Sequence, residues 1–174
     1  MTNPTQDSAK AAPTKRFFVS MLTRDITLTD AILDLVDNCL DGALRSAGKG
    51  QVDYSKHLIR IELSEAFFKI ADDCGGMSRE IARNNAFKMG RELGDDRDGD
   101  TETIGMYGIG MKRALFKMGR DSVVRSFHAQ DNFKVPISAA WLDEPTWQPL
   151  PIDDATPEEA LTVHGTTCPS GKSA

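Results

Sequence analysis

Residues 27 to 47 have hydrophobic positions that recur with the period of an α-helix. They follow the i, i+3, i+4, i+7 spacing of a buried stripe, and they are Ile32, Leu35, Val36, Cys39, Leu40 and Ala43. Thr27, with Asp30 three residues later, is a weaker form of the capping box that begins helices, and Gly48 is typical of a helix end. We therefore predict one long amphipathic helix around which the rest of the domain packs.

The opposite face of this helix is acidic, and it collects Asp30, Asp34, Asp37, Asn38 and Asp41. Residues 25 to 44 contain no lysine or arginine, so we expect a cation from elsewhere to lie over this face. A solvated outer face is the ordinary explanation of such a pattern. Asn38 argues against that explanation, because asparagine is a middling helix former that a plain solvated face has no reason to prefer. Its carboxamide could instead offer an oxygen to Mg²⁺ while Asp34 polarises a water.

Short apolar runs elsewhere predict strands and their connections. Strands are expected at residues 57–63, 67–71, 122–129 and 133–140, with a last one beginning at 160–164. Pro136 suggests an edge position. Residues 16–21 could be a strand or a docking arm, and residues 141–159 form a long connection packed by Trp141 and Trp147.

The strand at 67–71 runs into the sequence DDCGGM, which places the carboxylate of Asp72 at the rim of a sheet. Consecutive glycines let backbone approach a ligand there, although an acid followed by glycine is also ordinary turn chemistry. Ser78 then caps a helix that is expected to end near Gly90.

A polar stretch at residues 91–103 is expected to be mobile and leads into a glycine-rich segment, IGMYGIGMK. A helical run, RALFKM, follows and ends at Gly119. Free backbone N–H groups at that helix start favour an anion, and Lys112 in the first turn is therefore a phosphate candidate.

Three other motif interpretations fail on context. A calcium loop would need glycine at Thr101, and a dinucleotide fold would need the glycines soon after a first strand. The tail GTTCPSGKSA has Thr166 at the first glycine of a P-loop and no helix after Lys172.

Composition narrows the class of protein. The 174 residues suffice for one domain, and a net charge of −5 argues against direct nucleic-acid binding as its main role. No apolar run approaches membrane-spanning length, and no signal peptide is recognisable. Three cysteines without a C-x-x-C pair indicate neither a disulfide framework nor a zinc site, and a cytoplasmic location is expected.

Three motifs stand in order: an acid-x-x-x-Asn helix, an Asp-x-x-x-Gly-Met strand end, and a mobile loop entering Gly-x-x-Gly-x-Gly-x-Lys. This order resembles the GHKL ATPases, the superfamily of DNA gyrase, the ninety-kilodalton heat-shock chaperones, histidine kinases and mismatch-repair ATPases. The run DLVDNCLDGA is most similar to the microrchidia and heat-shock-like branch. The resemblance implies a Bergerat fold, an α/β (α+β) two-layer sandwich with a mixed, largely antiparallel sheet and helices on one face.

The resemblance also implies domain limits. Residues 1–15 would be a disordered lead, residues 16–167 the ATP-binding domain with an ATP lid at about 78–107, and residues 168–174 a tail. Relatives continue into a transducer domain that supplies a cation to the γ-phosphate. We therefore expect either a fragment awaiting that domain or a natural truncation.

Roles for individual residues come from the same resemblance. Asp34 would be the general base and Asn38 the Mg²⁺ ligand. Asp72 would accept the adenine amino group in a pocket shaped by Gly76 and Met77. The remaining contacts to ribose, phosphates and the adenine-side water network would come from Asn85, Gly105, Gly108, Gly110, Lys112 and Thr166.

The expected function is Mg²⁺-dependent ATP binding and slow hydrolysis, with lid closure coupled to association with a second copy or a partner. Two departures from the family pattern matter. Asp34 replaces the usual glutamate, and retracting the carboxylate by one methylene can cost about a hundredfold in rate. Cys74 replaces a glycine. A non-hydrolysing nucleotide switch is the main alternative, followed by a histidine-kinase catalytic domain and a plain α/β domain with coincidental glycines.

Overall fold

The computed structural model describes residues 12–48, 51–89, 109–129, 131–156 and 158–159. The expectations for Gly105, Gly108, Thr166, lid residues 90–107, the strand at 160–164 and the two chain ends (1–11 and 168–174) lie outside these ranges. The elements in chain order are α1 (Lys15–Arg24), α2 (Leu28–Ala47), η1 (Tyr54–Lys56), β1 (Ile59–Leu63), β2 (Phe68–Asp72), α3 (Arg79–Ile81), η2 (Ala82–Ala86), α4 (Gly110–Met118), β3 (Ser122–His128), β4 (Asp131–Ile137), α5 (Ala139–Asp143) and β5 (Asp153–Asp154).

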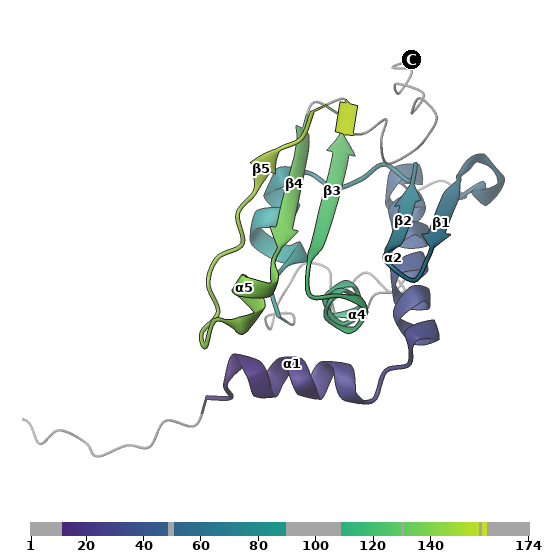
Figure 1. Ribbon diagram of the computed structural model, residues 1–174. Helices are drawn as coiled ribbons and strands as arrows, with labels where there is room; N and C mark the ends of the chain where they lie inside the picture. The colour runs from purple at the N-terminus through teal and green to yellow at the C-terminus, as the bar shows by residue number, and fades with distance from the viewer. Residues whose placement is uncertain (1–11, 49–50, 90–108, 130, 157, 160–174) are drawn as a thin grey trace, which may run out of the picture.

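The described strands form two antiparallel sheets. In the first, β1 pairs with β2 with Ile59 opposite Asp72, and in the second the order is β3, β4, β5 with Ser126 opposite Phe133. Figure 1 shows α2 behind β1 and β2, the segment of α3 and η2 behind β4, and α1 with α4 near one end of the strands. The predicted α+β class is confirmed.

Helix α2 has the predicted limits. Thr27 and Asp30 form a complete capping box, and Gly48 ends the helix with φ 62°. Leu35 and Cys39 lie on the buried stripe, and α2 packs against α4. Asp41, predicted on the acidic face, is instead buried, in a part of the helix where the neighbouring Gly42 packs closely against Cys74.

Residues 16–21 lie in helix α1, so the strand, one of the two alternatives expected for them, is wrong. The Thr14 side chain caps α1 by accepting a hydrogen bond from the Phe17 N–H. Lys15 is buried; its Nζ donates to the Trp141 carbonyl and lies 3.6 Å from the centre of the Trp141 ring. Trp147 packs edge-on against Phe18 at 5.8 Å between ring centroids. Trp141 and Trp147 therefore hold α1 in place. The stretch predicted as a long connection at residues 141–159 is in part regular structure, because it contains the end of α5 and strand β5, which pairs with β4.

Three other elements refine the sequence predictions. Ser78 caps α3 as expected, but the helix reaches only three residues before it continues as the π-helical η2, in which Asn84 and Asn85 have low helix propensity. Helix α4 ends before Gly119 as predicted. Pro136 lies beyond the two β4 residues that pair with β5, so β4 is locally an edge strand there. Within the described residues, no helix has the length and apolar character needed to cross a membrane.

Candidate functional site

Asp34 of α2 is paired with Arg113 of α4. Arg113 Nε donates to Asp34 Oδ2 and Nη2 donates to Oδ1, each at 2.9 Å. The Asp34 side chain is only 18 % exposed, so solvent screens this pair less than a surface ion pair. The expected cation over the acidic face is thus confirmed, and it is Arg113, a residue to which no sequence motif gave a role.

The first residue of α4 lies directly against the same carboxylate. A Cβ built on Gly110 would be 3.5 Å from Asp34 Cγ, an ordinary contact distance. The start of α4 presents free backbone N–H groups, which favour an anion. The structure therefore brings the predicted general base and the last predicted phosphate-loop glycine together.

Asn38 lies one turn after Asp34 and bonds back to it. Its Nδ2 donates to the Asp34 carbonyl oxygen at 2.6 Å, which fixes the orientation of the carboxamide. Burial raises the pKa of neighbouring Asp37, and the charges of Asp34 and Asp41 raise it further. This part of α2 therefore has an excess of negative charge that a bound cation would relieve.

Asp72, at the end of β2, is held by two groups. Its Oδ1 accepts from the Cys74 N–H at 2.9 Å, and its Oδ2 accepts from the Cys39 thiol at 3.3 Å. Burial, with the Asp72 charge second, raises the pKa of Cys39, so the thiol stays a neutral donor. Since Cys39 follows Asn38 on α2, the predicted adenine acceptor is tied to the helix that carries the predicted metal ligand.

Gly76 and Met77 are fixed against β3. Gly76 has φ 64°, and a Cβ there would come within 2.9 Å of both the Phe127 carbonyl oxygen and Ser126 Oγ, so the position requires glycine. The buried Ser126 hydroxyl accepts from the Met77 N–H at 2.8 Å and donates to the Met77 carbonyl at 2.9 Å. Ser126 is a positioning residue that no sequence motif indicated.

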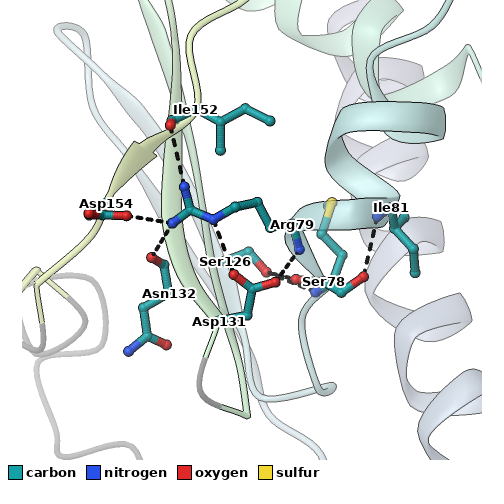
Figure 2. Close-up of polar contacts among 9 residues, drawn as sticks. Ser78, Arg79, Ile81, Ser126, Asp131, Asn132, Ile152 and Asp154 are labelled. Atoms are coloured by element: carbon teal, nitrogen blue, oxygen red, sulfur yellow. Dashed lines mark hydrogen bonds and ion pairs between the residues drawn. The ribbon is translucent and has the colours of Figure 1, made fainter.

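Arg79, immediately after the helix cap Ser78, fastens the same segment to the second sheet (Figure 2). Its Nε donates to Asp131 Oδ1 at 3.2 Å, and its Nη2 donates to Asp154 Oδ1 at 2.7 Å and to the Asn132 carbonyl at 3.1 Å. The Arg79 N–H and guanidinium lower the pKa of Asp131, with the backbone hydrogen bond the larger cause. The chain from Asp72 to α3 is thus held to both sheets.

Lys112 points to a different neighbour from Arg113. It is buried, and its Nζ donates to the Ala86 carbonyl at 2.9 Å, which joins α4 to η2. Asn85 precedes Ala86 and is half-buried. The two predicted phosphate and ribose residues therefore lie near one another at the junction of η2 and α4.

An acidic helix face with a carboxamide, a glycine-initiated helix packed against it and a strand-end carboxylate define a nucleotide-binding domain of α+β fold. The model of the histidine kinase-, DNA gyrase B- and HSP90-like ATPases matches residues 26–159, and the chain belongs to this family, whose members bind ATP. No match was found among curated proteins.

Proposed function

We propose that the domain binds ATP with Mg²⁺ and hydrolyses it slowly to ADP and phosphate. The observation that carries this proposal is the contact of Gly110, at the anion-favouring start of α4, with Asp34. That contact puts a carboxylate able to polarise water next to the place where phosphates would bind. Within the family, the run DLVDNCLDGA favours the microrchidia and heat-shock-like branch.

The donors on α2 suit a hard divalent cation. Asn38 directs its Nδ2 to the helix backbone, so its Oδ1 is the atom to offer a metal, and the nearby carboxylates supply further oxygen atoms. When bound, Mg²⁺ would neutralise phosphate charge. Burial, and then the charges of Asp34 and Asp41, raise the pKa of Asp37, and a cation at this position would offset that repulsion.

Arg113 would set the activity of Asp34. Both oxygens of this carboxylate accept hydrogen bonds from the guanidinium, so a water can reach them only where this pairing opens. Arg113 lies in the first turns of α4, so phosphates bound at that helix start would compete with Asp34 for its charge. Binding of ATP would thus release Asp34 in part, and the retained pairing would keep hydrolysis slow.

The other contacts complete the proposal. Asp72 would accept the adenine amino group beside Gly76 and Met77, Asn85 would face the ribose and phosphates, and Thr166 would join the adenine-side water network. The phosphates would contact Gly105, Gly108, Gly110 and Lys112. Closure of a lid at about residues 78–107, and association with a second copy or a partner domain, would follow ATP binding, as family membership suggests.

A non-hydrolysing nucleotide switch is the second candidate. It is favoured by the two-point pairing of Asp34 with Arg113 and by the short aspartate side chain in place of glutamate. In that case ATP would bind and no phosphate would be released.

Two aspartate substitutions test the two candidates. Thermal stability is measured with ATP and with a non-hydrolysable analogue, with and without Mg²⁺, alongside phosphate release. We expect a Mg²⁺-dependent gain in stability, and a turnover that Asp34→Asn reduces at least about a hundredfold, while Asp25→Asn, which removes a carboxylate from an exposed ion pair just before α2, preserves it. Stabilisation without release would establish the switch, and no stabilisation of a folded sample would refute nucleotide binding at this site.

A further inference from the structure

We propose that His57, Asp73 and Cys74 form a binding site for a transition-metal ion of the Zn²⁺ class. Each residue offers one ligand atom, and the three atoms lie within 4.8 Å of one another. His57 precedes β1 and the other two follow β2, so the cluster closes the open end of the hairpin, away from its turn.

The buried Nδ1 atom of His57 lacks a hydrogen bond to any described residue. Among buried side-chain nitrogen and oxygen atoms of the described residues, only His57 Nδ1 has no hydrogen-bond partner. It lies 3.4 Å from Asp73 Oδ1. Buried polar atoms are normally satisfied, so a nitrogen left unpaired beside a carboxylate and a thiol is a ligand-like arrangement.

The carboxylate is already oriented by the sheet. Asp73 Oδ1 accepts from the Leu58 N–H at 2.8 Å, and the Asp73 N–H donates to the Leu58 carbonyl at 3.3 Å. Hydrogen bonds that hold a ligand in place are typical of built metal sites. His57, just before β1, and Asp73, just after β2, are thereby held at the open end of the hairpin with their polar atoms 3.4 Å apart.

Cys74 supplies the atom that determines the class of metal. Its side chain is buried, so the three donors would surround an ion sheltered on the thiol side. One imidazole nitrogen, one carboxylate oxygen and one sulfur suit tetrahedral Zn²⁺ with water as the fourth ligand, whereas Mg²⁺ and Ca²⁺ avoid sulfur. The three ligand atoms now lie within 4.8 Å of one another. To bind one metal ion at distances of about 2.0 to 2.3 Å, they would need to move only modestly closer together.

A cobalt titration tests the site without depending on nucleotide binding. The metal-free chain is titrated with Co²⁺ under reducing conditions in the absence of ATP, and then with Zn²⁺. We expect one Co²⁺ per chain, a thiolate-to-cobalt absorption band, and displacement by Zn²⁺. His57→Gln and Cys74→Ala should each weaken Co²⁺ binding more than about 100-fold, since even indirect supporting residues contribute 10- to 100-fold.

Two nearby residues provide matched controls. His128 binds the Gly75 carbonyl through its Nδ1 at 2.8 Å, and Cys39 lies in the same hydrophobic cluster as Cys74, but neither belongs to the three-residue group. His128→Gln and Cys39→Ala should keep the cobalt band, as should Asn38→Ala, which alters only the proposed Mg²⁺ ligand.

Specific outcomes would overturn the proposal. They are the absence of a thiolate band at stoichiometric Co²⁺, a band that persists in Cys74→Ala, or a band lost in Cys39→Ala. If Cys74→Ala does not fold by circular dichroism, His57→Gln decides, because His57 is partly exposed and packs less tightly. Unchanged Co²⁺ affinity in folded His57→Gln also refutes the site.

Discussion

Arg113 Nη2 lies 2.7 Å from Asp34 Oδ2, and the guanidinium spans both carboxylate oxygens of the residue proposed as the general base. The same contact fastens α4 to α2. This ion pair thus stabilises the packing of α4 on α2 and also occupies the carboxylate that would activate water. Its removal should therefore lower the stability of the fold and raise the rate of hydrolysis.

Loss of Arg113 should destabilise the fold. Arg113→Gln leaves Asp34, which is mostly buried, without its partner. We expect the free energy of unfolding in urea to fall by about 1 to 2 kcal/mol, less than for a fully buried pair because Arg113 is about a third exposed. Arg120→Gln, which breaks an exposed pair with Asp143, is the control and should cost less than about 1 kcal/mol. Equal losses in the two variants would contradict a structural role for the Asp34 pair.

The same substitution should accelerate hydrolysis. In Arg113→Gln the guanidinium no longer occupies both oxygens of the Asp34 carboxylate, which become accessible to the attacking water, so phosphate release at saturating ATP should rise several-fold. Adding Asp34→Asn to this variant should abolish the gain. A decrease as large as that of Asp34→Asn alone would instead assign Arg113 to direct contact with the substrate.

Gly76 should tolerate alanine much less than Gly48 does. Both glycines have positive φ, 64° and 62°, but only at Gly76 would a Cβ meet the Phe127 carbonyl and Ser126 Oγ. We expect Gly48→Ala to lower the free energy of unfolding by about 1 kcal/mol and Gly76→Ala by about 2 to 4 kcal/mol. Chemical denaturation measures both, and similar costs would show that the segment can move away from β3.

Acid should weaken the attachment of α3 through Asp131. Its pKa is lowered in the folded state, so the native carboxylate keeps its charge at pH values where the unfolded chain binds a proton. This contribution is complete above the unfolded pKa of about 4 and is lost as pH falls through the lowered native value. Asp131→Asn should therefore reduce the difference in unfolding free energy between pH 7 and pH 3. An unchanged difference would contradict this assignment.

Local periodicity predicted α2, its cap and the strand-end position of Asp72, because these depend on neighbouring residues. Residues 16–21 were expected to be a strand or a docking arm because so short an apolar run has no clear period, and the contacts of α1 with distant Trp141 and Trp147 leave no local signal. Arg113 and Ser126 act through contacts 79 and 49 residues away along the chain, and such pairings leave no periodic signal. The His57 cluster escaped notice for the same reason, because pairing of β1 with β2 brings its members together.

The hydrogen bond from Lys112 Nζ to the Ala86 carbonyl has an evolutionary consequence. It joins α4 to η2 between residues that are 26 positions apart in the sequence. The acceptor is a backbone carbonyl, which every residue type offers, whereas the donor is a buried side-chain cation. Position 86 should therefore accept many residue types in homologous chains, while position 112 should keep a long basic side chain.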